Sequence, residues 1–186
     1  MSRRGLATLL ALAAVACGAT PSATRIDLRA YLARSRTWAP VEAEAEHTIE
    51  RILRTQFVDE AEIRRQIADS RPRILAHLQM LRALQPQSKD VTRIHERYVG
   101  AWERLLAGYD AIEEGFSSGD YTKLARGREA MEAWRATIVA VADDLRELMQ
   151  HFGVAPDGAV ESRVRGARPQ SVTQSTKSRA RPSTIA

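Results

Sequence analysis

Two long stretches of this chain place their apolar residues at intervals that alternate between three and four. The pattern holds without a miss over residues 91–116 and returns over residues 124–152. Because an α-helix repeats every 3.6 residues, such intervals put these side chains on one face. The positions concerned are Val91, His95, Tyr98, Trp102, Leu105, Tyr109, Ile112, Phe116, Leu124, Gly127, Met131, Trp134, Ile138, Val141, Leu145, Leu148 and Phe152. The pattern predicts long helices that bury these faces against one another.

Two earlier stretches carry the same kind of pattern and complete the predicted fold. Residues 39–57 and 59–84 are rich in Ala, Glu, Arg and Leu, which favour helix. Their apolar faces hold Val41, Ala45, Ile49, Ile52, Ile63, Ile67, Ser70, Ile74, His77, Leu81 and Leu84. Short turns near Pro86 and Gly119 favour antiparallel neighbours. We therefore predict an all-α domain at residues 37–154, folded as an antiparallel up-down-up-down four-helix bundle.

The start of the chain has the layout of a secretory signal peptide. Arg3 and Arg4 precede a largely apolar run at residues 6–15, and Cys17, the only cysteine, follows that run. The run is too short to span a bilayer as a helix, which is typical of a signal peptide. We predict a signal peptide at residues 1–16.

The four residues Ala14-Val15-Ala16-Cys17 resemble the lipobox of bacterial lipoproteins, in which the cysteine is acylated and becomes the first mature residue. The same residues also fit the small-x-small pattern read by the ordinary signal peptidase, and both cleavages leave Cys17 first. A lone cysteine at the cut favours lipidation, because an unmodified secreted thiol would be unpaired and reactive.

The resemblance implies that Cys17 carries acyl chains such as palmitate and anchors the protein to a membrane of the cell envelope. Gly18 follows the cysteine in place of the aspartate that retains some lipoproteins in the inner membrane. An outer-membrane location facing the periplasm is therefore favoured over the inner membrane. Residues 17–36 are then predicted to form a tether that includes a short helix at 26–35.

The positive charge of the chain is concentrated at its two ends. Residues 26–152 carry 19 Lys and Arg against 21 Asp and Glu, whereas residues 153–186 carry six basic against two acidic residues. Few apolar residues follow Pro156, so we predict a disordered basic tail at residues 155–186. Export argues against nucleic acid as a partner, although charge alone would permit it.

The sequence contains few patterns that carry chemistry. It lacks a haem-attachment cysteine pair, a Gly-rich phosphate loop and a nucleophile elbow. We therefore expect no enzymatic activity and no cofactor. The predicted function is that of a non-catalytic binding or structural component of the envelope, whose partner is another envelope protein or a cell-wall polymer.

His77 and His95 support an alternative function, the binding of a metal or small ligand. Each lies nine residues from the turn at Pro86, so an antiparallel pair of helices puts both in one layer. Counting across the next turn brings Asp144 to the border of that layer, and the first helix brings Trp38 to the same level. Two histidines and a carboxylate are ligands that zinc or copper accepts. The structural interpretation, which we favour, is two half-buried histidines that hydrogen-bond to each other, to Asp144 or to water.

Trp102 and Trp134 also fall in nearby layers of their two helices. A flat ligand could stack between them, but aromatic residues at helical spacing are more often part of a core. We expect these two tryptophans to be core residues.

Overall fold

The computed structural model describes residues 22–55, 57 and 59–155. Within this part of the chain, the regular secondary structure consists of five helices. They are α1 (Ala23–Ser35), α2 (Ala39–Arg54), α3 (Glu60–Arg82), α4 (Lys89–Ser118) and α5 (Tyr121–Phe152). The prediction of an all-α fold is confirmed. The predicted signal peptide, Cys17 and the tail after Ala155 lie outside the described residues.

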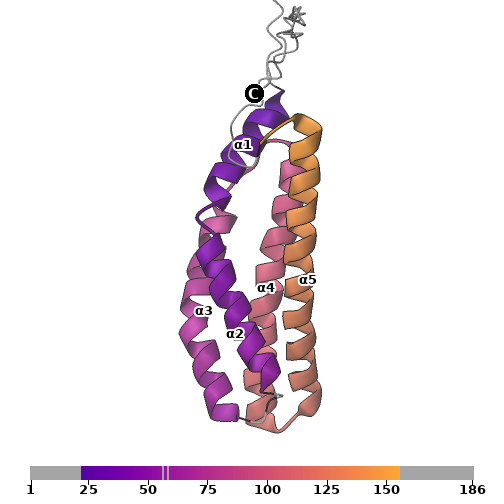
Figure 1. The fold of residues 1–186 in the computed structure, drawn as a ribbon. Helices are drawn as coiled ribbons and strands as arrows, with labels where there is room; N and C mark the ends of the chain where they lie inside the picture. The colour runs from indigo at the N-terminus through magenta and orange to yellow at the C-terminus, as the bar shows by residue number, and fades with distance from the viewer. Residues whose placement is uncertain (1–21, 56, 58, 156–186) are drawn as a thin grey trace, which may run out of the picture.

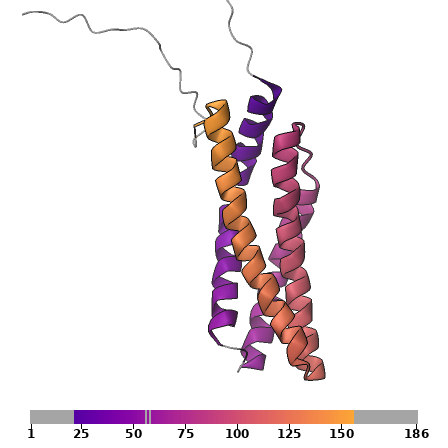
Figure 2. The same cartoon turned by 90° about the vertical axis from the view of Figure 1, so that its right-hand side faces the viewer.

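The five helices lie along one common direction and enclose a single core (Figure 1). The start of α1, the connection at 83–88 and the end of α5 lie at the upper end of Figure 1. The end of α2, the start of α3 and the connection at 119–120 lie at the lower end. α4 and α5 converge toward the lower end and separate toward the upper end, as the turned view shows (Figure 2).

The helix ends follow the local chemistry of the sequence. Asp59 accepts a hydrogen bond from the backbone N–H of Glu62 at 3.0 Å, which caps the start of α3. Asp120 caps α5 in the same way, through the N–H of Thr122 at 2.9 Å. Gly119 ends α4 at φ 64°, a left-handed conformation that glycine adopts without strain.

The apolar faces predicted from the sequence form the core. Every predicted position from Val91 to Ile112 is buried, and Phe116 is partly buried. On α5, Met131 and Trp134 are buried, whereas Leu148 near its end is only partly buried. This difference follows from the separation of α4 and α5 toward the upper end.

The packed body begins earlier than the sequence predicted. Leu28 and Tyr31 of α1 are buried in the common core. The Asp27 carboxylate accepts hydrogen bonds from the backbone N–H groups of Gln87 at 3.0 Å and Ser88 at 2.8 Å, where α4 begins. α1 therefore belongs to the packed body, and the prediction that the domain starts at residue 37, after a tether, is wrong.

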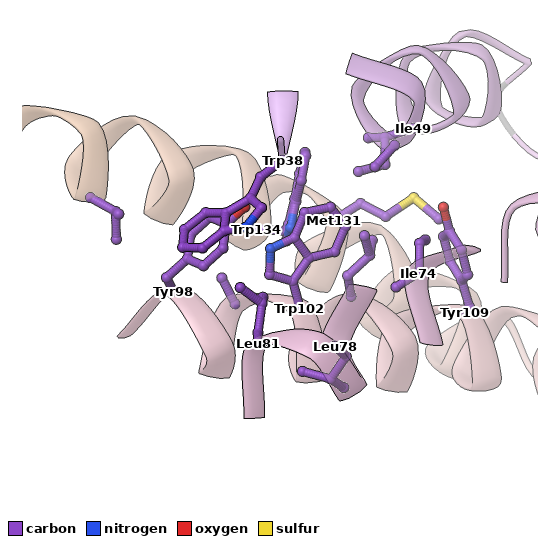
Figure 3. Close-up of a cluster of buried hydrophobic side chains, with 14 of the residues drawn as sticks. Trp38, Ile49, Ile74, Leu78, Leu81, Tyr98, Trp102, Tyr109, Met131 and Trp134 are labelled. Carbon is purple, nitrogen blue, oxygen red and sulfur yellow. The ribbon is translucent and has the colours of Figure 1, made fainter. Parts of the chain in front are cut away.

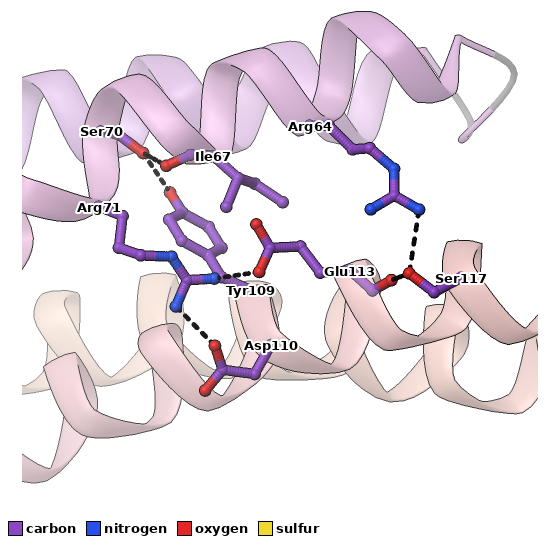
Figure 4. Close-up of polar contacts among 8 residues, drawn as sticks. All are labelled: Arg64, Ile67, Ser70, Arg71, Tyr109, Asp110, Glu113 and Ser117. Atoms are coloured by element: carbon purple, nitrogen blue, oxygen red, sulfur yellow. Dashed lines mark hydrogen bonds and ion pairs between the residues drawn. The ribbon is translucent and has the colours of Figure 1, made fainter.

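Polar side chains join α3 and α4 along their outer edge (Figure 4). The Arg71 guanidinium donates to the carboxylates of Asp110 at 2.5 Å and Glu113 at 2.7 Å. Next to it, Ser70 Oγ lies 3.4 Å from the Tyr109 hydroxyl, and burial raises the pKa of Tyr109 to about 12. This seam fixes α3 against α4 over the lower half of both helices.

Glycine allows α4 and α5 to approach closely where they converge. A Cβ atom placed on Gly127 would lie 2.3 Å from Ile112 Cγ1 and 2.8 Å from the Gly108 carbonyl oxygen. A Cβ atom on Gly108 would lie 2.7 Å from the Ala130 Cβ. All three separations are shorter than van der Waals contact, so the two backbones pack at a distance that only glycine permits at these positions.

We predict that Gly127→Ala lowers the free energy of unfolding by about 1–3 kcal/mol, because the added methyl group forces α4 and α5 apart. Gly100→Ala is the matched control, since a Cβ atom there meets no atom within 4 Å. Gly100→Ala should raise the free energy of unfolding by about 0.5–1 kcal/mol, because alanine has a higher helix propensity than glycine. Urea unfolding of both variants measures the difference. Equal effects of the two substitutions would contradict the close contact.

Candidate functional site

Aromatic side chains from four parts of the chain gather at one level of the bundle, and Figure 3 shows the tyrosine and the tryptophans among them. Trp38, in the turn between α1 and α2, stacks on Tyr98 of α4 with ring centroids 5.2 Å apart. Trp102 packs edge-on against Trp134 of α5 at 5.1 Å and against His77 of α3 at 4.7 Å. Trp38 lies at the level of His77, as predicted, and the centroids of the two rings are 6.1 Å apart. The cluster is the centre of the core.

A chain of hydrogen bonds leads from this cluster to the surface of α2. The Tyr98 hydroxyl donates to the Glu42 carboxylate, because an ionised carboxylate can only accept. The same hydroxyl oxygen lies 3.3 Å from His77 Nε2 and must therefore accept from an Nε2–H group. His77, Tyr98 and Glu42 thus form one directed chain that joins α3, α4 and α2.

Burial sets the protonation of this chain. Burial and then the negative charge of Glu42 raise the pKa of the Tyr98 hydroxyl far above its usual range, so that it remains a donor. Burial lowers the pKa of His77 to about 4. At neutral pH the His77 ring is therefore uncharged, with its one N–H on Nε2, where it donates to Tyr98.

His95 makes a separate pair of contacts near the upper end of the bundle. Its Nε2 atom lies 3.1 Å from the Leu81 carbonyl oxygen, which can only accept, so Nε2 carries the proton. Its Nδ1 atom lies 3.3 Å from the Tyr31 hydroxyl and accepts from it. Burial lowers the pKa of His95 as well, which keeps this neutral form. His95 therefore joins α1 and α3 to α4.

The structure does not assemble the predicted metal site of His77, His95 and Asp144. The Asp144 carboxylate forms an ion pair with Arg97 instead. Both imidazoles direct their N–H groups at protein acceptors, and the lone pair of His95 accepts from a tyrosine. In the part of the chain that is described, no group of three or more His, Cys, Asp or Glu side chains is placed to hold a metal ion. The partners of the histidines are tyrosine hydroxyls and a carbonyl group, rather than each other or Asp144.

An open groove between α2 and α5 borders the aromatic cluster. Its volume is about 460 Å³, within the range of small-molecule sites. Its apolar lining consists of Ala39, Ala43, Trp134, Ile138 and Val139, and its polar lining consists of Glu42, Glu46 and Arg135. Glu46 and Arg135 form an ion pair with each other, in which Arg135 Nε lies 3.2 Å from Glu46 Oε2. Glu42 is thus the terminal acceptor of the Tyr98 chain and also part of this groove.

The separated upper ends of α4 and α5 leave a second, larger hollow of about 530 Å³. Much of its polar lining is already neutralised within the protein. Arg97 pairs with Asp144, and Arg93 lies 3.9 Å from Asp90. The groove between α2 and α5 is the better candidate for a binding site, because its walls are apolar and its polar groups are few.

Sequence reasoning placed His77, Trp102 and Trp134 correctly in the core but missed Glu42 as a site residue. The only local signal is the position of Glu42 next to Val41, at the edge of the apolar face of its helix. That position cannot show that a buried hydroxyl from α4 reaches the carboxylate.

Comparison with known proteins gives no match to a family model, to a curated protein or to a solved structure. None of the helices described here is both long and apolar enough to cross a membrane.

We predict that acid destabilises the fold through His77. Its pKa is about 4 in the folded chain and about 6.5 in the unfolded chain, so the unfolded chain binds more protons between these values. The stabilisation is complete above pH 6.5 and is lost as the pH falls toward 4. Between pH 7 and pH 5 the free energy of unfolding of the wild type should fall by on the order of 1–2 kcal/mol more than that of His77→Gln. Urea unfolding at the two pH values measures the difference. Gln keeps an N–H donor for Tyr98 but does not titrate.

The control for this experiment is His47→Gln, because His47 is exposed on α2. The free energy of unfolding of His47→Gln should depend on pH in the same way as that of the wild type. If His77→Gln lost stability with acid as steeply as the wild type, the buried neutral state of His77 would be refuted.

Proposed function

We propose that this chain is a bacterial envelope lipoprotein, held at a membrane by acyl chains on Cys17, with its helical body as a non-catalytic binding component. The observation that carries the proposal is the lone cysteine at the end of the apolar run, directly after Ala14-Val15-Ala16. Only residues 18–22 separate it from α1. Such a segment spans roughly 20 Å at most, so the anchor would keep the helical body near the headgroups.

We further propose that the body is an antiparallel up-down-up-down four-helix bundle in which α1 and α2 together form the first arm. The order of the helices in Figure 1 and the packing of α2 on α3, α3 on α4 and α4 on α5 support this arrangement. The upper end of Figure 1 would then face the membrane, because α1 begins there. We favour the outer membrane, with the body in the periplasm.

The groove between α2 and α5 supports a binding role for the body. It combines apolar walls with a carboxylate, Glu42, at its edge. His77 and His95 form hydrogen bonds with protein groups in the core, so they support neither catalysis nor metal binding. A binding role in the envelope, with another envelope protein or a cell-wall polymer as the partner of the body, agrees with this geometry.

We predict that the protein made in bacterial cells incorporates labelled palmitate and partitions into detergent. Several acyl chains are needed for firm attachment, since one chain alone binds a membrane only marginally. Cys17→Ser removes the acceptor sulfur and should abolish both the label and the partitioning. Soluble wild-type protein with a free Cys17 thiol and no label would contradict the proposal.

A further inference from the structure

We propose that the groove between α2 and α5 binds a small amine, a ligand that joins an apolar body to a primary ammonium group. The inference deepens the binding role proposed above by giving its ligand class, and it does not depend on the acylation of Cys17. Three features of the groove carry it: a carboxylate that forms no ion pair with another described residue, apolar walls, and an arginine whose charge is already neutralised.

The carboxylate is that of Glu42. Its Oε1 atom accepts the hydrogen bond from the Tyr98 hydroxyl, which is neutral, so the negative charge persists. Within the described residues, no Lys, Arg or His nitrogen lies within 4.0 Å of this carboxylate. One oxygen of Glu42 is left to accept from a ligand, and a cation there would form a charge-assisted hydrogen bond.

The walls of the groove suit an apolar body. Val139 of α5, a large apolar residue, is 62% exposed in the wall of the groove. The small side chains of Ala39 and Ala43 on the facing helix leave the space that the groove occupies. Trp134 forms the buried floor beneath these residues, so an apolar ligand body would lie over the aromatic core.

The remaining charges exclude other ligand classes. The Glu46 carboxylate neutralises the charge of Arg135. The hydrogen bond that Arg135 donates to Glu46 raises the pKa of the guanidinium above its usual value. An anionic ligand would therefore meet the charge of Glu42, and no unpaired cation among the described lining residues would offset that charge. A neutral ligand would dehydrate the Glu42 carboxylate without pairing it, which is unfavourable. A bare metal ion would lack ligand atoms on the apolar walls. A compact ammonium group on an apolar body satisfies both parts of the groove.

The test is a titration of the chain from residue 17 onward, with Cys17→Ser, which contains every residue of the described fold. The probe is 2-phenylethylamine, and 2-phenylethanol is its uncharged match of similar size. Tryptophan fluorescence and calorimetry report binding. We expect saturable binding of the amine with a Kd of roughly 1 mM or tighter, and binding of the alcohol at least about tenfold weaker.

Two variants locate the site, and one serves as the control. Glu42→Gln removes the charge but keeps an oxygen acceptor for Tyr98, and it should weaken amine binding about tenfold or more. Ala43→Phe fills the groove and should abolish binding. Glu50→Gln is the matched control, because Glu50 is an exposed glutamate of the same helix that pairs with Arg54. It should bind like the parent chain. Circular dichroism establishes that each variant is folded.

The inference is overturned if the amine does not bind at about 10 mM, well above the expected Kd. It is also overturned if the amine and the alcohol bind equally well, or if the parent chain and Glu42→Gln bind the amine equally well. Loss of acylation in cells would refute the lipoprotein proposal but would leave this titration unchanged. A failed titration would leave acylation of Cys17 unchanged, so the two failures can be told apart.

Discussion

The arrangement of the helices depends on how the buried Tyr98 hydroxyl is satisfied. A buried hydroxyl without partners costs about 1–3 kcal/mol, so its position is tolerated only where a donor and an acceptor meet it. His77 of α3 supplies the donor and Glu42 of α2 supplies the acceptor, while Tyr98 itself lies on α4. One hydroxyl thereby fixes three helices relative to one another. The negative charge at its end also sets the direction of every hydrogen bond in the chain.

α5 lies outside this hydrogen-bonded chain and is held by packing and by ion pairs such as that of Asp144 with Arg97. Its contact with α4 depends on glycine at positions 108 and 127, and Trp134 joins it to the aromatic cluster through Trp102. α2 and α5 are joined by the ion pair of Glu46 and Arg135, and a groove remains between the two helices, with Glu42 at its edge. The same carboxylate therefore stabilises the core and gives the groove its charge. This double role is the structural basis of the proposed amine binding.

The sequence predicted what depends on helical period. It identified the buried faces of α3, α4 and α5 and the shared level of Trp38 and His77. It missed α1 as a packed element, because the contact of Asp27 with the start of α4 joins residues far apart in the chain. It misplaced Asp144, because counting residues across a turn assumes equally spaced helices, whereas α4 and α5 separate and Arg97 pairs with the carboxylate. No sequence pattern indicates which carboxylate reaches a buried hydroxyl.

A double-mutant cycle between Glu42→Ala and Tyr98→Phe tests the central claim most directly. Urea unfolding of the parent chain, the two single variants and the double variant gives the coupling free energy between the two side chains. If the Tyr98 hydroxyl donates to the ionised Glu42 carboxylate, the losses in free energy of unfolding of the two single variants should not be additive. We predict a coupling free energy of at least about 1 kcal/mol. Losses that add to within about 0.3–0.5 kcal/mol would show that Glu42 does not hold Tyr98, and would contradict this account of the fold.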